Sequence, residues 1–491
     1  MNRATLIGVL SLIPALASGE VELLTQPSDS PLITIRILFQ TGAAYDPDGK
    51  EGAASLTASM LAEGGTQSAS YAEIVERLFP IAAQVHSQVD KETTVFYGTT
   101  HIDKLETYYE TLRSMLLEPG WQQEDFSRLK DDALNLLRIE LRSNNEEELG
   151  KEHLYLSVYG DHPYGHHNSG TAASLAALTI EDLKQFYATN YRHGNLIIGL
   201  SGGYPEGFPE RVVKDFSALP EGTPDALQLP APTPAEKVRV RIIEKETRST
   251  LISLGFPLEV TRSDPDWPAL KLVQSYFGQH RTSKSYLYQR IREIRGMNYG
   301  DYAYIEYFPH GMFQFQPDPN LVRRQQIFQI WIRPVVPENG LFALKIALYE
   351  LDKLVREGLS QADFDSTRLY LSKFVNLLTQ TQSAELGYAL DSRLYGIGEF
   401  NSFMKDGLAK LTRESVNEAI KRHLRSTNLD VTIITADAGG FARQLRSPAS
   451  TKIQYASPPP QEILDEDPVI GAYRIDLGDV QVVPVDTVFE D

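Results

Sequence analysis

Alternation of apolar and polar residues with a period of two marks several segments of the chain as β-strands. Longer segments in which apolar residues recur every three to four positions are predicted to be amphipathic α-helices. Strands and helices follow one another in the same order in both halves of the chain. The segments are 32–42, 93–102, 105–118 and 195–202 in the first half, and 249–260, 325–335, 342–358 and 428–437 in the second.

Direct similarity between the two halves indicates a tandem duplication. Segment 178–200 (LTIEDLKQFYATNYRHGNLIIGL) aligns with 411–433, and Thr179 matches Thr412 at an offset of 233 residues, as Asn195 matches Asn428. Two shorter matches in the same order, GWQQEDF with GLSQADF and SASY with SKSY, have offsets of 238 and 215. Three ordered matches are hard to obtain by chance. The chain is therefore interpreted as two copies of a unit of somewhat more than 200 residues.

This order of elements predicts an α+β fold of two tandem homologous lobes, each an antiparallel-rich sheet with helices packed on one face. A proline-rich segment between the copies is expected to act as an extended linker. Two such lobes should face each other across a cleft, and clefts between domains are favoured ligand sites. The predicted boundaries are 1–19 for an export signal, 20–218 for the N-terminal lobe, 219–236 for the linker, 237–445 for the C-terminal lobe and 446–491 for a C-terminal extension.

Composition excludes several kinds of partner and site. The chain of 491 residues is too long for one core, and its net charge is −18, from 47 Lys and Arg against 65 Asp and Glu. This charge argues against nucleic acid or an anionic membrane as partner, because both require a basic surface. The chain has no cysteine, which excludes disulfides, thiolate metal sites and a catalytic thiol. The densest charge cluster, 144–152 (NNEEELGKE), mixes both signs and is interpreted as a solvent-exposed helix face.

The first residues have the pattern of a secretory signal. Arg3 precedes an apolar run from Ala4 to Ala17, whose last residues offer the small side chains of a cleavage site. The run is too short to span a bilayer comfortably, and no second one follows. The chain is therefore predicted to be exported and soluble, in a periplasm or outside the cell. An uncleaved membrane anchor is the alternative.

A further helix is predicted at 51–66 (EGAASLTASMLAEGGT), where Leu56, Met60 and Leu61 have helical spacing and the neighbouring face carries only small residues. The run GAAYDPDGKEGAASLTASMLAEGGT, the later GDHPYGHHNSG and the duplication together resemble the insulinase/pitrilysin family of zinc peptidases. This family includes the subunits of the mitochondrial processing peptidase and the core subunits of the respiratory bc1 complex. The resemblance runs from about Glu20 to the final third of the second copy.

The resemblance implies that helix 52–62 stands where active members carry H-x-x-E-H, with two zinc-binding histidines and a glutamate that activates water. In this chain the histidine positions are Ser55 and Ser59, and the glutamate position is Ala58. Serine hydroxyls are poor zinc ligands, and alanine cannot accept a proton. We therefore expect this chain alone to lack the activity of its family. The alternative is an unrelated helix of small residues.

No other metal site is predicted. The family's third ligand, a glutamate on a later helix, falls near Asn135, with Glu140 as the nearest acid. His162, His166 and His167 cluster in a loop rich in Gly, Pro and Asn, where adjacent histidines are more often solvated than ligating. Zinc is therefore expected only in a catalytic partner.

A second resemblance lies in the second copy. The run LYQRIREIRGMNYGDYAYIEYF is similar to the family's substrate-binding segment, in which an arginine and a tyrosine seven residues later reach across the cleft. These positions are Arg292 and Tyr299. An arginine can hold a peptide carbonyl or carboxylate, and a phenol can donate to an oxygen on which charge develops. The alternative is an exposed helix end and tyrosines of a sheet.

Three hypotheses of function follow. In the first, the chain is the non-catalytic subunit of a two-chain zinc peptidase, which closes the chamber and helps to bind an unfolded peptide for a partner that carries H-x-x-E-H. In the second, it is a non-proteolytic peptide-binding or assembly module. In the third and weakest, it is an active metalloendopeptidase with an unrecognised ligand set. The first two imply a heterodimer or an assembly, and none implies nucleic acid.

Overall fold

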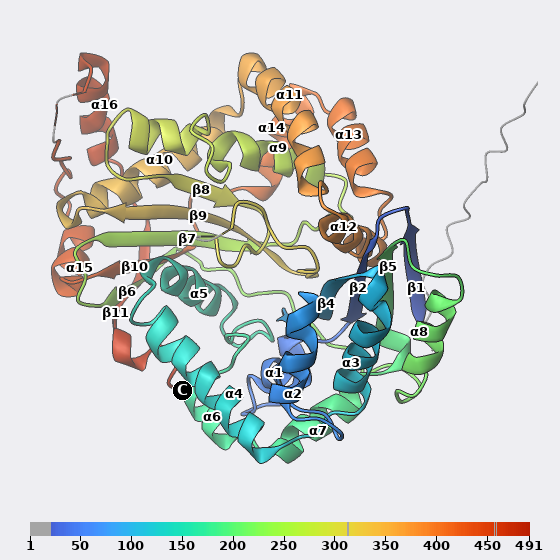
Figure 1. Cartoon of the computed structure of the whole chain (residues 1–491). Helices are drawn as coiled ribbons and strands as arrows, with labels where there is room; N and C mark the ends of the chain where they lie inside the picture. Colours follow the sequence, from blue (N-terminus) through green and yellow to red (C-terminus); the bar gives the residue numbers. More distant parts are fainter. Residues whose placement is uncertain (1–20, 312–313, 456, 458) are drawn as a thin grey trace, which may run out of the picture.

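The computed structural model describes residues 21–311, 314–455, 457 and 459–491, and shows two lobes side by side (Figure 1). The expected export signal, 1–19, lies outside the described residues. Each lobe has one β-sheet, and its helices lie mostly on one face of that sheet. The predicted α+β fold of two tandem lobes that face each other across a cleft is confirmed.

The first lobe contains a five-stranded sheet in the order β1-β5-β2-β4-β3. Its strands pair antiparallel except β1, which runs parallel to β5. Strand β2 is buried on both faces: Ile33, Ile35 and Ile37 enter the main core of the lobe, while Leu38 faces the opposite side. The strands are β1 Glu22–Pro27, β2 Leu32–Phe39, β3 His86–Val89, β4 Thr94–His101 and β5 Leu196–Gly202.

The helices that follow in the first lobe include one π-helix, η4, which continues directly from α4. They are α1 Ala53–Glu63, α2 Tyr71–Leu78, α3 Leu105–Leu117, α4 Gln123–Asn135, η4 Leu136–Leu141, α5 Glu146–Tyr159, α6 Ala172–Ala177, α7 Ile180–Asn190 and α8 Phe208–Phe216.

The second lobe contains a six-stranded sheet in the order β11-β6-β10-β7-β9-β8. Strand β6 pairs in parallel with β10 and β11, and the other neighbours are antiparallel. The segment expected to be a C-terminal extension thus supplies an edge strand, β11, to this sheet. The strands are β6 Val238–Glu244, β7 Thr250–Leu258, β8 Asp301–Tyr304, β9 Gln326–Val335, β10 Asp430–Thr435 and β11 Leu477–Pro484.

The helices of the second half also include one π-helix, η6, just before β8. They are α9 Trp267–Gly278, η6 Tyr288–Glu293, α10 Gly340–Glu357, α11 Gln361–Leu378, α12 Gln382–Tyr395, α13 Phe400–Lys410, α14 Arg413–His423, α15 Ala438–Arg446 and α16 Gln461–Gly471.

The repeated sequence forms the same local structure in both lobes. Thr179 and Thr412 are the N-cap residues of α7 and α14, and each takes part in a capping box. Each side chain accepts a hydrogen bond from the backbone N–H three residues later, which the helix itself leaves unpaired. The strands β5 and β10 follow these helices, and each is an inner strand of its sheet.

The two halves exchange one helix each. Helix α5, from the first half, packs on β7 and β10 of the second sheet, while α12, from the second half, packs on β2 and β5 of the first. Leu390 of α12 is fully buried against Leu38, Val95 and Ile197. Each sheet is therefore covered on its other face by a helix of the opposite half, which explains why β2 and β5 are apolar on both faces.

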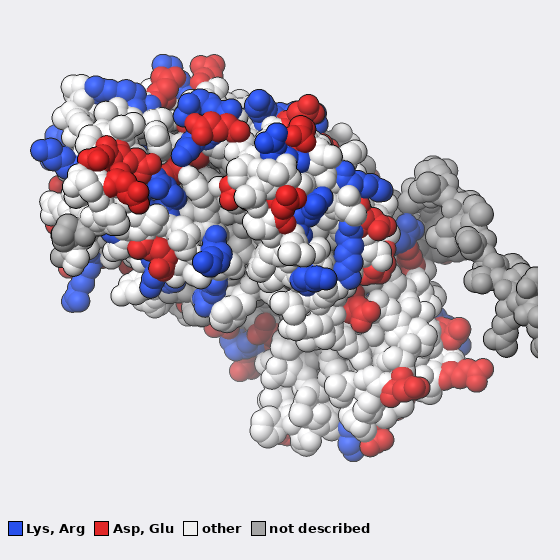
Figure 2. Space-filling model, turned by 90° about the horizontal axis from the view of Figure 1, so that it is seen from above, with Lys and Arg blue, Asp and Glu red and all other residues white. Residues whose placement is uncertain are grey.

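No helix in the described part of the chain is both long and apolar enough to cross a membrane. Basic and acidic side chains are interspersed on the face shown in Figure 2, without a continuous basic area. This distribution agrees with the overall negative charge.

Candidate functional site

The start of helix α1 is fixed by one buried carboxylate and one glycine. Asp46 accepts hydrogen bonds of 2.7 Å from the N–H groups of Gly52 and Ala54, two of the groups that a helix start leaves unpaired. Gly52 has φ +94°, and a Cβ there would lie 2.6 Å from the carbonyl oxygen of Ser169. Only glycine allows α1 to begin so close to the loop 167–170.

Two of the three degenerate zinc positions face a cavity between the lobes. Ser55 and Ser59 line this cavity, whose volume is about 470 Å³, whereas Ala58 is fully buried in the core of the first lobe. The Ser55 hydroxyl donates a 2.7 Å hydrogen bond to the carbonyl oxygen of Asn168. The helix therefore presents its family positions to a cleft, but only as small hydroxyl groups.

The cavity has walls from both lobes. The first lobe contributes α1, strand β3, the π-helix η4, helix α5 and the loop 167–169, and the second lobe contributes parts of the segment 307–321. Among the described residues that line it are four acidic side chains and neither lysine nor arginine. These acidic residues are Glu63, Glu148, Glu152 and Asp318.

The third zinc position is also without a ligand. Asn135 and Glu140 are exposed and are not among the residues that line the cavity, where η4 places Leu136 instead. Among the described residues, no three His, Asp or Glu side chains lie close enough together to hold a metal ion. Of the three histidines in the loop, His167 reaches the cavity, and His166 lies 3.3 Å from the Asp46 carboxylate.

Among the acidic residues that line the cavity, Glu152 has a pKa far above its ordinary value. Burial, followed by repulsion from Glu148, raises its pKa to about 7. Tyr307 donates a 3.2 Å hydrogen bond to Glu152, and His167 lies 3.8 Å away. Burial lowers the pKa of His167 to about 3, so this ring is neutral at pH 7. Glu148, in contrast, is ion-paired with Lys151 at 2.5 Å.

The interpretation of 144–152 as a solvated helix face is wrong for its central residues. Glu148 and Lys151 are only 3% and 2% exposed, and Glu152 lines the cavity. The reason is the exchange of α5, which places this helix between the two lobes. Periodicity alone carries no signal for such a position, because α5 has a charged face like that of a surface helix.

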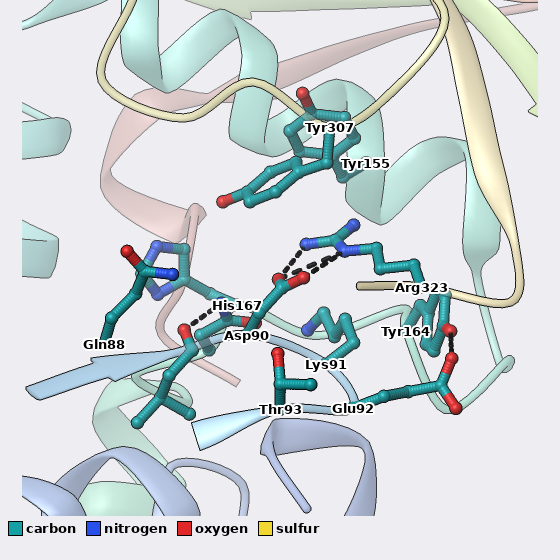
Figure 3. A network of polar contacts seen from close by, with 12 residues as sticks. Gln88, Asp90, Lys91, Glu92, Thr93, Tyr155, Tyr164, His167, Tyr307 and Arg323 are labelled. Atoms are coloured by element: carbon teal, nitrogen blue, oxygen red, sulfur yellow. Dashed lines mark hydrogen bonds and ion pairs between the residues drawn. The ribbon is translucent and has the colours of Figure 1, made fainter. Parts of the chain in front are cut away.

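A network of buried polar contacts holds the lobes together beside the cavity (Figure 3). Asp90, in the turn between β3 and β4, accepts hydrogen bonds from Arg323 of the second lobe, with 2.8 Å between Nε and Oδ2. The Arg323 guanidinium also lies 3.6 Å from the centre of the Tyr307 ring. Lys91 donates to the carbonyl oxygen of His166, and burial lowers its pKa to about 7.

The segment that carries Arg323 is attached to the same turn by further hydrogen bonds. Gln88 donates to the carbonyl oxygen of Pro319 at 3.0 Å, and Thr93 donates to that of Asn320 at 2.7 Å. Strand β3 is the edge strand of its sheet and lines the cavity with Ser87, Gln88 and Val89. The position of this edge therefore depends on both lobes.

Arg292 and Tyr299 lie outside this cavity. Arg292, on η6, is ion-paired with Glu293 and lies over the Tyr288 ring, and its side chain is 37% exposed. Tyr299, just before β8, is 76% exposed. Both side chains are accessible from solvent. If they bind substrate, they would do so at the surface, in contact with another molecule. Such a role stays a prediction.

Two models of one protein family match most of this chain. The family model described as insulinase (peptidase family M16) matches residues 23–172, and the model described as the peptidase M16 inactive domain matches 177–371. The chain is 20% identical over 414 residues to the non-peptidase homolog YmxG of Helicobacter pylori, covering 82% of this chain and 89% of that protein. An uncharacterized zinc protease of Rickettsia bellii is 24% identical over 287 residues, or 57% of this chain and 66% of that protein.

Solved structures share the fold. The M16 inactive domain protein of Pseudomonas fluorescens has a TM-score of 0.73 at 24% identity, covering 85% of this chain and 96% of that one. The periplasmic protease PqqL of Escherichia coli has a TM-score of 0.68 at 15% identity, and this chain covers 52% of its length while 98% of this chain is matched. These structures share the two-lobed α+β fold of this chain. The chain belongs to the insulinase (M16) peptidase family, as an inactive member whose zinc helix lacks both histidines and the glutamate.

Proposed function

We propose that this chain is a non-catalytic subunit that binds unfolded peptide in the cavity between its lobes and serves a catalytic partner carrying H-x-x-E-H and zinc. The observation that carries the proposal is the position of Ser55 and Ser59. They line an open cavity between the lobes, as expected of an active-site helix that has lost its ligands but kept its cleft. A chain with no binding role would have no need to keep this space open.

The cavity suits an extended peptide. Strand β3 is an edge strand, and a peptide can add to such an edge by main-chain hydrogen bonds. Its last residue, Val89, is already engaged at its carbonyl oxygen, which accepts a 3.0 Å hydrogen bond from Asn168. The acidic residues of the cavity, in the absence of lysine and arginine from its walls, favour a peptide with basic side chains. The pKa of Glu152, about 7, gives this binding a pH dependence. A bound cation favours the charged form of Glu152, so the affinity for basic peptides should rise as the pH increases through 7.

A partner is supported by the exposed pair and by one structural neighbour. Arg292 and Tyr299 are available to a second molecule. The chain also matches the first half of the periplasmic protease PqqL over 97% of its own length, with a TM-score of 0.66. A separate catalytic subunit would take the place that the second half has in that protein. Export to a periplasm is part of the same proposal.

Peptide binding by the isolated chain tests the proposal. A labelled, unfolded, lysine-rich peptide should bind at least about tenfold more tightly than the same peptide with glutamate in place of lysine. Ser59→Trp fills the cavity and should abolish binding. The matched control is Ser402→Trp, on an exposed surface of α13 far from α1 in the sequence. Equal binding by both tryptophan variants would contradict the proposal, and no binding by the unmodified chain would favour the assembly module.

A further inference from the structure

The segment 485–490 crosses from the second lobe to the first. It follows β11, the edge strand of the second sheet, and ends beside α4 and α6 of the first lobe (Figure 1). The N–H groups of Ala172 and Ala173 donate to the carbonyl oxygens of Phe489 and Glu490, at 2.8 and 2.9 Å. The segment is thus bound to the first lobe by its backbone.

Its apolar side chains are buried in the first lobe. Val488 and Phe489 are 4% and 5% exposed and belong to the core of that lobe. The Phe489 ring lies against the imidazole of His167, with 5.3 Å between ring centres. His167 lines the cavity, so the segment supports this wall from behind.

Its acidic side chain is held by Arg138 of the π-helix η4 and by Arg142, the residue that follows η4. Glu490 accepts hydrogen bonds from Arg138 at 2.9 and 2.6 Å and from Arg142 at 2.6 Å. Arg142 also donates to the carbonyl oxygens of Asp486 and Val488, at 2.9 and 3.2 Å. The same π-helix places Leu136 and Leu141 in the cavity wall. A π-helix is a rare backbone form that occurs frequently at functional sites.

We infer that segment 485–490 is a latch that positions two walls of the cavity, η4 and the loop 167–169, and thereby sets the affinity of the cavity for peptide. The effect on peptide affinity rests on the proposed function, whereas the positioning of the walls does not. The latch couples the walls to the second sheet, because β11 pairs with β6 there. Phe489 and Glu490 act as positioning residues through His167 and η4.

Hydrogen exchange of the full chain, measured by mass spectrometry, tests the latch without any ligand. In Phe489→Ala and Glu490→Gln, amides of 136–142 and 167–173 should exchange at least about tenfold faster, while those of α3 and α9 keep their rates. Glu106→Gln is the matched control, because Glu106 forms an equally bidentate pair with Arg211 in the same lobe without contacting the cavity. It should leave both segments unchanged.

Peptide affinity gives the second readout. The two latch variants should bind the lysine-rich peptide at least about threefold more weakly, and Glu106→Gln should bind it as the unmodified chain does. If Phe489→Ala fails to fold, Glu490→Gln still tests the latch. The Glu490 side chain is 30% exposed, so its substitution should not prevent folding. Unchanged exchange in Glu490→Gln would overturn the latch. Failure of the unmodified chain to bind peptide would overturn the proposed function and leave the exchange result as the test of the latch.

Discussion

The three residues of α1 that we interpret as the degenerate zinc positions differ in their surroundings. Ser55 and Ser59 face the cavity, where a histidine could extend toward a metal. Ala58 is fully buried, so the place of the catalytic base has been closed by packing as well as by substitution. Restoring the motif would therefore require more than three side chains, because the region expected to supply the third ligand presents Leu136 to the cavity and no acidic side chain.

We expect Ala58→Glu to lower the free energy of unfolding by roughly 3 kcal/mol, because it buries a carboxylate without a partner. Ser55→His with Ser59→His should leave stability within about 1 kcal/mol, since both positions border open space. Urea denaturation compares the two variants. Equal stability of Ala58→Glu and the unmodified chain would show that the packing around α1 is looser than described.

Arg292 and Tyr299 should matter only in an assembled enzyme. Removing one donor to a transition state costs roughly 10²–10³ in rate, whereas neither exposed side chain supports the core. Arg292→Ala and Tyr299→Phe should therefore leave folding and partner binding intact and reduce cleavage by the complex about 100-fold or more. Steady-state kinetics of the complex measures this effect. If the variant complexes cleave at the rate of the unmodified complex, Arg292 and Tyr299 have no role in catalysis.

At this scale the sequence predicts the degenerate positions and misses the acidic wall. Ser55, Ala58 and Ser59 follow from a short motif and its resemblance to the family. Glu148 and Glu152 become site residues only because α5 lies between the lobes. Their sequence context is that of an exposed helix, so local pattern alone could not have identified them.

The exchange of α5 and α12 makes each sheet depend on the opposite half of the chain. The repeat and the alternation of elements predict the two sheets and the helices that cover them. They do not predict which sheet an amphipathic helix covers, because an apolar face specifies burial without specifying a partner. The edge strand β11 was missed for a related reason: its pattern of mostly exposed residues gives a weak strand signal.

His153 offers a pH test of the α5 interface. Its Nδ1 lies 3.1 Å from Thr432 Oγ1 of β10, and burial, with repulsion from Arg241, lowers its pKa to about 4 from 6.5. A folded-state pKa below the unfolded one gives stability that is complete above pH 6.5 and lost as pH falls toward 4. The loss is at most about 3 kcal/mol. His153→Gln should therefore lose less stability than the unmodified chain between pH 7 and 4, as measured by urea denaturation, and equal losses would place His153 in contact with solvent.

At the scale of the whole molecule, a buried ion pair joins the two lobes beside the cavity. Asp90 and Arg323 are 0% and 2% exposed and come from different lobes. Asp90→Asn leaves the arginine charge uncompensated and should lower the free energy of unfolding by about 3–5 kcal/mol. Glu414→Gln, which breaks an exposed pair with Arg413, should have no measurable effect. Thermal or urea unfolding measures both, and equal stability would show that Arg323 is hydrated.

The most direct test of the account is chelator-sensitive peptidase activity, measured on the isolated chain and on the complex recovered with a tagged chain from the native cells. The account predicts that the isolated chain holds no stoichiometric zinc and cleaves no unfolded peptide. The complex should contain about one zinc, held by the partner's H-x-x-E-H, and should lose its activity on chelation. Zinc retained by the isolated chain through dialysis, together with cleavage that a chelator abolishes, would contradict it.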